Sequence, residues 1–129
     1  MAASELTNSL PLRVLAGGRI FVAATHLLTP RLITRAFGMK ATGTPAIAYG
    51  RMFGIRTAFL AAGLLNLEKF SEPRTFVKIN VLIDTVDAVA FLAAGQRKDV
   101  SATSAALGVG VSLTAAAAGA VALRNDLGR

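Results

Sequence analysis

Five charged side chains interrupt stretches of sequence that are otherwise apolar, and their types and spacing are the ones that could do chemistry. They are Arg19, Arg51, Arg56, Asp84 and Asp87. A charged group at the centre of a lipid bilayer costs on the order of 2.5–3.5 kcal/mol on insertion scales, so such groups pair with one another or line a path for ions or protons. Two interpretations stay open: an ion-pair network that holds helices together, and a path for a small ion or a proton-coupled solute.

Helical geometry places opposite charges at matching heights. With a rise of about 1.5 Å per residue, Arg19 and Asp84 lie roughly 14–16 Å from the same end of their segments, and Arg56 lies at about the same height. Asp87 and Arg51 lie nearer that end, at roughly 9–12 Å. We therefore expect an Arg–Asp network between helices. Arg51 and Arg56 are about 140° apart around one helix, so one of them must point into a cavity, at a partner subunit or toward lipid headgroups.

The spacing of other polar residues extends this network. Asn80, Asp84 and Asp87 follow the i, i+4, i+7 pattern and form a polar stripe on one helix face. Arg19 and His26 are seven residues apart and share a face of an earlier helix. Because His26 is near a helix end, we expect it to be an interfacial side chain rather than a proton relay.

The pair Asp84 and Asp87 also has the D-x-x-D spacing with which two carboxylates can hold a divalent cation. Membrane enzymes that transfer phosphoalcohol groups use a motif that begins this way, but they need further acids downstream. Here the next acid is Asp99, beyond the expected helix end. Phosphate-binding loops, dinucleotide fingerprints, zinc-protease motifs and nucleophile elbows are absent from the sequence. We expect no metal, no cofactor and no enzymatic activity.

Four apolar stretches must position these residues. Each is close to the length of about 17–25 residues that spans a bilayer as a helix. Helix-start signals at Thr44-Pro45, Ser71-Glu72-Pro73 and Asp99 or Ser101, with Gly95 as a helix stop, agree with their limits. The sequence therefore predicts an all-α fold, a four-transmembrane-helix bundle in one domain, 1–129, with spans at about 12–28, 46–67, 76–95 and 101–123.

A fifth, shorter helix is predicted between the first two spans. Thr29-Pro30 resembles a helix start and Gly38 a stop. Between them Leu32, Ile33, Ala36 and Phe37 fall on one face, and Arg31 and Arg35 fall on another. This pattern favours a basic amphipathic helix that lies at the membrane surface. An ordinary solvated loop is the alternative.

Small residues recur every fourth position in two of the spans, which favours close packing of helices. The second span has Gly50 and Gly54, followed by Ala58 and Ala62. The fourth has Gly108 within a series of small residues: Ser104, Gly108, Ser112, Ala116 and Ala120. We expect these stripes to form contacts within the bundle or between subunits.

Composition supports a membrane location. Of the 129 residues, 53% are hydrophobic and only 16% are charged, well below the quarter that is usual in soluble domains. The net charge of +7 comes from scattered Lys and Arg without interleaved aromatics, so we expect no nucleic-acid partner but anchoring to anionic lipid. No basic region precedes the first apolar stretch, so we expect it to be retained as a span. The loop charges, five Lys and Arg against four, lean toward both termini lying outside the cell, but a difference of one residue does not decide the orientation.

The runs Y-G-R-M-F-G-I-R-T-A-F-L-A-A-G-L-L-N-L (49–67) and L-I-D-T-V-D-A (82–88) resemble small four-helix integral membrane proteins of high-GC actinobacteria. The resemblance covers the second and third spans. It implies a multi-pass protein of the bacterial cell membrane and implies no activity. Small multidrug transporters are similar in size but depend on an acid in the first helix, which has none here, and the motifs of fluoride channels are not matched.

These features predict an accessory or structural subunit of a homo- or hetero-oligomeric membrane complex. Its expected partners are membrane lipid and either other membrane subunits or copies of itself. The alternative is a homo-oligomeric transporter or channel for a small ion or a proton-coupled solute. A lipid-binding protein or membrane enzyme would require Arg51 or Arg56 to bind an anionic headgroup.

Overall fold

The computed structural model describes residues 8–127, whose regular structure is entirely helical, and the predicted all-α class is confirmed. The prediction that no signal peptide is present rests on Met1–Ser9, most of which lies outside the described residues. Five α-helices and one short 3-10 helix follow one another: α2 (Leu10–Leu28), α3 (Pro30–Ala36), α4 (Ala46–Leu64), η1 (Leu67–Lys69), α5 (Pro73–Gln96) and α6 (Ala102–Asn125).

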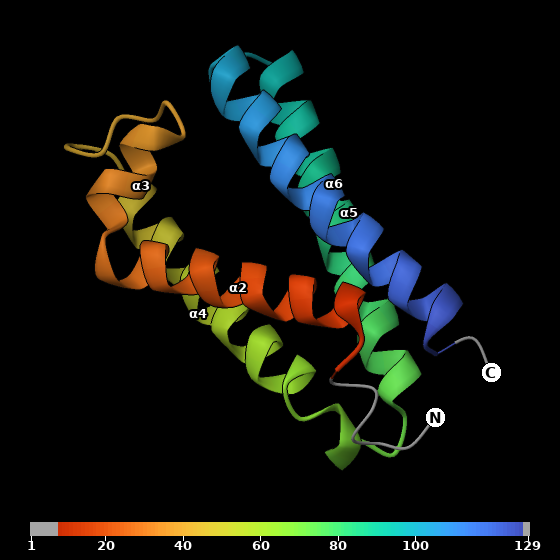
Figure 1. Ribbon diagram of the computed structural model, residues 1–129. Coiled ribbons are helices and arrows are strands. Elements are labelled where there is room, and N and C mark those ends of the chain that lie inside the picture. The colour runs from red at the N-terminus through yellow and green to blue at the C-terminus, as the bar shows by residue number, and fades with distance from the viewer. Residues whose placement is uncertain (1–7, 128–129) are drawn as a thin grey trace.

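The four long helices form two pairs, α2 with α4 and α5 with α6. Figure 1 shows the pairs meeting close to the ends of the described chain and diverging toward α3 and the α5–α6 turn. The pairs are joined mainly through α2 and α6, whereas α4 and α5 hardly touch. The bundle is therefore open between its two halves.

An apolar core joins the pairs at the end where they meet. It combines the start of α2, the end of α4, the start of α5 and the end of α6, in the residues Leu12, Leu15, Ala16, Leu64, Leu67, Val77, Ala122 and Leu127. Arg74 of α5 binds the end of α6 and the residues after it. It donates hydrogen bonds to the carbonyl oxygens of Leu123 and Leu127. Away from this core, the interface between the pairs becomes polar.

The distribution of polar and apolar side chains is inverted relative to that of a water-soluble domain. Six polar residues of the four long helices are buried: Arg19, Thr57, Asn80, Asp84, Ser104 and Ser112. Large apolar side chains point outward along all four long helices, among them Phe21, Met52, Phe59, Leu82, Val86, Val89 and Leu113. Large apolar side chains are thus exposed on every long helix, while polar side chains are buried between them.

Judged singly, by length and composition, α6 is the one helix within residues 8–127 that is long and apolar enough to cross a membrane. The helices α2 and α3 reach that standard together, but a bend of 114° separates them. Charged residues interrupt α4 and α5, which lowers their hydropathy. Four spans are thus not evident from the individual helices.

Some predicted helix ends are wrong, for local reasons. Gly95 does not end α5, which continues to Gln96, and Lys98 takes the left-handed conformation with φ of 61°. Gly95 instead allows close approach to α6, because a Cβ there would lie 2.6 Å from the Cβ of Ala105. Ser101 caps α6 as predicted, by accepting a hydrogen bond from the N–H of Ser104.

The caps expected at Thr44 and Ser71 are also wrong by one residue. Pro45 is the N-cap of α4, and Thr44 only accepts a 3.4 Å hydrogen bond from the N–H of Ala46. Glu72 is the N-cap of α5, with Pro73 in the first turn. In both helices proline still marks the start, because its ring fixes φ and its missing N–H is not needed there.

Candidate functional site

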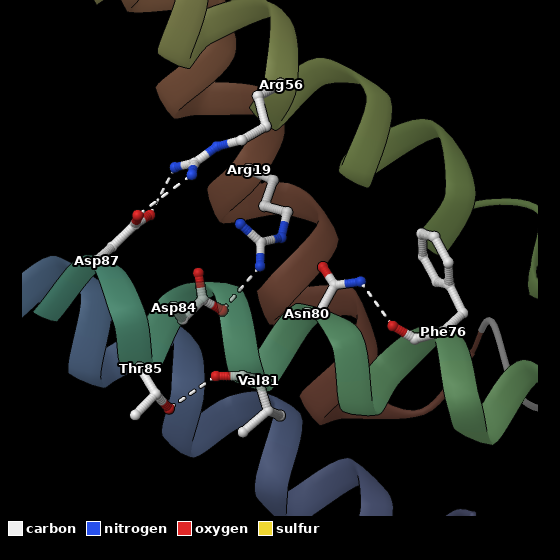
Figure 2. A network of polar contacts seen from close by, with 8 residues as sticks. All are labelled: Arg19, Arg56, Phe76, Asn80, Val81, Asp84, Thr85 and Asp87. Carbon is white, nitrogen blue, oxygen red and sulfur yellow. Dashed lines mark hydrogen bonds and ion pairs between the residues drawn. The ribbon is translucent and has the colours of Figure 1, made fainter. Parts of the chain in front are cut away.

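The first ion pair lies deep in the bundle. Arg19 of α2 donates a 2.7 Å hydrogen bond from Nη2 to Oδ2 of Asp84 on α5, and the two side chains are only 7% and 5% exposed. Figure 2 shows the guanidinium group of Arg19 reaching from α2 to the face of α5 that carries Asp84. Because both side chains are almost fully buried, each charge depends on the other.

The second ion pair lies one turn further along α5. Arg56 of α4 donates from Nη1 to Oδ1 of Asp87 over 3.2 Å and from Nη2 to Oδ2 over 2.5 Å, which gives a two-pronged contact (Figure 2). Its guanidinium carbon lies 4.9 Å from the ring centre of Phe53, within cation–π range. This pair is half-exposed, with 41% of the Arg56 side chain and 21% of the Asp87 side chain accessible.

The predicted network thus contains two separate pairs, and Arg51 takes part in neither. Arg51 is exposed on the outer face of α4, beside the exposed Tyr49 and Met52. It is therefore the arginine that points elsewhere, which the 140° separation from Arg56 required.

The polar stripe on α5 changes from buried to half-exposed along its length. Asn80 is fully buried and donates from Nδ2 to the carbonyl oxygen of Phe76, one turn earlier on its own helix (Figure 2). Asp84 is buried and Asp87 is half-buried. His26 lies nearer the open end of the bundle, where its Nδ1 donates to the carbonyl oxygen of Val22 over 2.7 Å.

His26 is packed between aromatic rings. The rings of Phe53 and Phe37 meet it edge-on, with centroids 5.0 Å and 6.2 Å away. Because Nδ1 carries the proton that Val22 accepts, Nε2 is the acceptor of the neutral ring. The side chain is half-buried, and it lines a cavity rather than the ion-pair network.

The glycines expected at helix contacts do lie there, but the space around them differs. A Cβ on Gly54 would lie 3.0 Å from the Cβ of His26, whereas one on Gly50 would have 3.8 Å to the same side chain. A Cβ on Gly108 would overlap the ring of Phe91 at 2.3 Å. Gly54 and Gly108 therefore allow close approach of the paired helices, and Gly50 leaves room.

One polar residue of the interior, Thr57, was not among the expected residues, whereas Ser112 was expected only as a small packing residue of the fourth span. The buried face of α4 runs through Gly54, Thr57, Ala61 and Leu64, so its steps alternate between three and four residues. The predicted small-residue stripe of this helix used a constant step of four residues. Because a helix turn contains 3.6 residues, positions four apart gradually leave the buried face. An alternating step would have identified Thr57.

A cavity of about 440 Å³ adjoins both carboxylates; we call it the inner cavity. Arg19, Asp84, Asp87 and Thr57 line it, together with residues of α6 that include Ser112. Nε of Arg19 and Oγ1 of Thr57 are buried without a hydrogen-bond partner in the protein. Polar atoms of this kind are usually satisfied by water, for which the inner cavity has both room and partners.

A larger cavity of about 640 Å³ opens where the helical pairs diverge; we call it the basic-end cavity. It lies between α3, the loop that follows it, the first turns of α4 and α6, and the end of α5. Val22, Phe53, Val111 and Ser112 line both cavities, so the two are neighbours separated by these side chains. Within residues 8–127, no three His, Asp or Glu side chains gather as metal ligands.

No family model, no curated protein and no solved structure matches the chain. The resemblance to four-helix membrane proteins of actinobacteria therefore stays a prediction. Functional inference depends on the geometry of the ion pairs, the cavities and the outer apolar surface.

Proposed function

We propose that the chain is a multi-pass protein of the bacterial cell membrane and serves as an accessory or structural subunit of a homo- or hetero-oligomeric membrane complex. In this proposal α2, α4, α5 and α6 are the four spans, and α3 lies at the membrane surface. One observation carries the subunit role: the Arg56–Asp87 pair is half-exposed near the middle of α4 and α5, on a side where these helices hardly touch.

The membrane location is supported by the inverted polarity of the fold. In water, the outward-facing Phe21, Phe59, Leu82, Val86 and Leu113 would form an unfavourable surface on a small protein. In a bilayer the same side chains face hydrocarbon, while the paired Arg19 and Asp84 face the interior. The arrangement suits lipid better than water.

The charges in α4 and α5 are compatible with spanning segments because they are paired. A single Arg or Asp at mid-bilayer is costly, and pairing with the opposite charge removes much of that cost. Both carboxylates of α5 have an arginine partner, one from α2 and one from α4. The bend of 114° after α2 agrees with α3 leaving the direction of the spans and lying along the surface.

The open side of the bundle needs a cover. In a bilayer, the accessible part of the Arg56–Asp87 pair would face lipid, where its exposed hydrogen-bonding groups have no partners. A helix from another subunit or a second copy of this chain would shield the pair and bury the adjacent Met52, Phe59 and Val86.

Native mass spectrometry of the protein, extracted gently from its own membranes, tests this proposal. We expect a complex that contains another polypeptide or several copies of this chain in fixed ratio. A protein that stays in the soluble fraction contradicts the membrane location. A membrane-bound monomer without a polypeptide partner contradicts the subunit role.

A transporter or channel is the second candidate, and one observation favours it. Asp84 and Asp87 both line the inner cavity, and the neighbouring basic-end cavity lies between it and one end of the bundle. A path through both cavities could bring protons or small ions to the carboxylates. Proton flux into proteoliposomes that is lost in Asp87→Asn, with the fold retained, would support this role over the structural one.

A further inference from the structure

We propose that the basic-end cavity binds one anionic phospholipid, with an acyl chain inside the cavity and the phosphate group near Lys40. The proposal builds on the membrane location proposed above and adds a specific ligand. It is independent of which polypeptide covers the Arg56–Asp87 pair.

The interior of the cavity suits a hydrocarbon chain. Its volume of about 640 Å³ lies within the range of roughly 300–1,000 Å³ that is typical of ligand sites. Apolar side chains from four helices surround it, namely Val22, Phe53, Phe91 and Val111 with Phe37 at the end of α3. A chain of methylene groups is the ligand that such a lining accepts without loss of hydrogen bonds.

The rim of the cavity suits a phosphate group. Lys40 and Tyr49 line this part, and each of their side chains can donate a hydrogen bond to a phosphate oxygen. The Thr44 hydroxyl also lines it but already donates to the carbonyl oxygen of Lys40. Asp99 lies on the same rim and disfavours an anion. The first turns of α4 and α6 also line the cavity, and the positive ends of these helices add to the field of Lys40.

The surrounding segments are strongly basic. The two connections at this end, residues 29–45 and 96–101, hold five cations and one acid: Arg31, Arg35, Lys40, Arg97 and Lys98 against Asp99. At the opposite end four cations stand against three acids: Arg13, Lys69, Arg74 and Arg124 against Glu68, Glu72 and Asp126. This asymmetry matches an anionic lipid at the end that holds the cavity.

A flexible chain fits the cavity better than a partner helix. Ser104 of α6 donates a 2.6 Å hydrogen bond to the carbonyl oxygen of Phe37, which ties α3 to α6 at the wall of the cavity. A helix, with a diameter of about 10–12 Å, needs a wider opening beside this link than an acyl chain does. An acyl chain can enter beside it.

The test is native mass spectrometry of the full-length protein in detergent, titrated with phosphatidylglycerol or with phosphatidylcholine of the same acyl chains. We expect one phosphatidylglycerol to stay bound at a concentration where phosphatidylcholine does not. Equal retention of both lipids, or retention of several molecules without a first tight site, would overturn the proposal. A co-purified polypeptide that blocks lipid binding at this site would also overturn it.

A glycine pair separates a cavity site from general lipid adhesion. Gly50→Leu directs a side chain into the cavity, where a Cβ meets only His26 at 3.8 Å. Gly17→Leu is the matched control on the outer face of α2, where nothing lies within 4 Å of the new Cβ. We expect Gly50→Leu to lose the bound lipid and Gly17→Leu to keep it. Retention by both variants would refute the cavity as the site.

A lysine pair tests the headgroup. We expect Lys40→Gln to weaken binding of phosphatidylglycerol about fivefold, the effect of one surface cation on an anionic lipid, and to leave phosphatidylcholine unchanged. Lys78→Gln, at an exposed position of α5 away from the cavity, is the control. Equal effects of the two substitutions would contradict the placement of the phosphate group.

A second cavity-filling pair covers the case in which Gly50→Leu does not fold. Val111→Phe adds volume inside the cavity, and Leu113→Phe adds it on the outer face of the same helix. Only Val111→Phe is expected to expel the lipid. If the protein is found in a membrane complex but binds no phosphatidylglycerol, the lipid site is refuted and the proposed function stands. If the protein is found in the soluble fraction, the proposed membrane location is refuted as well.

Discussion

Arg19 and Asp84 join two helices, α2 and α5, that belong to different helical pairs. The Arg56–Asp87 contact does the same for α4 and α5. The α2–α4 pair therefore supplies both arginines and the α5–α6 pair supplies both carboxylates. Beyond the apolar core, two charge contacts hold the halves of the bundle in one register.

Loss of the buried carboxylate should destabilise the protein strongly. In Asp84→Ala, Arg19 keeps its burial but loses its partner, which typically costs about 3–5 kcal/mol. We expect lower accumulation in membranes and a lower midpoint of thermal unfolding in detergent, followed by circular dichroism. Asp99→Ala, which removes an exposed carboxylate, is the control. Wild-type stability of Asp84→Ala would contradict the structural role of the pair.

Replacement of both buried charges tests whether the pair is needed as such. We expect Arg19→Met combined with Asp84→Leu to recover most of the stability lost in Asp84→Ala, because well-packed apolar residues often replace a buried ion pair without loss. Thermal unfolding of the double variant measures this recovery. A double variant as unstable as Asp84→Ala would show that the polar groups contribute more than their mutual contact.

The half-exposed pair should matter for assembly more than for folding. We expect Asp87→Asn to change the free energy of unfolding of the isolated protein by less than about 1 kcal/mol, as for other accessible ion pairs. The same substitution should reduce the fraction of assembled complex in native mass spectrometry. Exchange of the charges, Arg56→Asp with Asp87→Arg, should restore more assembly than either substitution alone. Unchanged assembly in Asp87→Asn would contradict the proposed cover.

Two glycines of α6, two residues apart, should respond differently to substitution by alanine. A Cβ on Gly108 would overlap Phe91 at 2.3 Å, so Gly108→Ala should cost about 1–3 kcal/mol through overpacking. Gly110→Ala meets nothing within 4 Å and should be neutral or slightly stabilising. Thermal unfolding separates the two, and Phe91→Leu should partly rescue Gly108→Ala. Equal midpoints would argue against close packing of α5 on α6.

The charge asymmetry predicts the orientation of the chain. The basic end should face the cytoplasm, which places both termini outside. The sequence contains no cysteine, so single cysteines report cleanly on access. We expect a membrane-impermeant maleimide to label Glu68→Cys in intact cells and to label Lys40→Cys only after the cells are opened. The reverse pattern would invert the orientation.

The sequence predicts the helices and the charge pairing of this fold well, because both depend on local spacing. Leu10–Leu28 and Ala102–Asn125 begin and end within two residues of the predicted spans. The pairing of Arg19 with Asp84 agrees with their matching heights. The heights also matched Arg51 with Asp87, which is wrong, because Arg56 makes that contact. The end of α4 was less predictable, since Leu67 lies on η1 and belongs to the core that joins the pairs.

The open arrangement of the two halves could not be predicted. Sequence spacing shows which residues share a helix face, but the divergence of the pairs depends on how bulky contacts such as Phe91 on Gly108 fill space. The cavities between the pairs follow from that divergence. For the same reason the aromatic surroundings of His26 were not foreseen, because Phe37 and Phe53 come from separate segments.

The measurement that tests the central claim most directly is the environment of one outward-facing residue on each long helix. Nitroxide labels would replace Phe21, Phe59, Val86 and Leu113, all of which are exposed apolar positions, in protein reconstituted into bilayers. If all four long helices span the bilayer, we expect every label to be inaccessible to a water-soluble nickel complex. We also expect every label to be accessible to dissolved oxygen, except where a partner subunit covers it. Ready access of the nickel complex to labels on α4 and α5 would contradict the account.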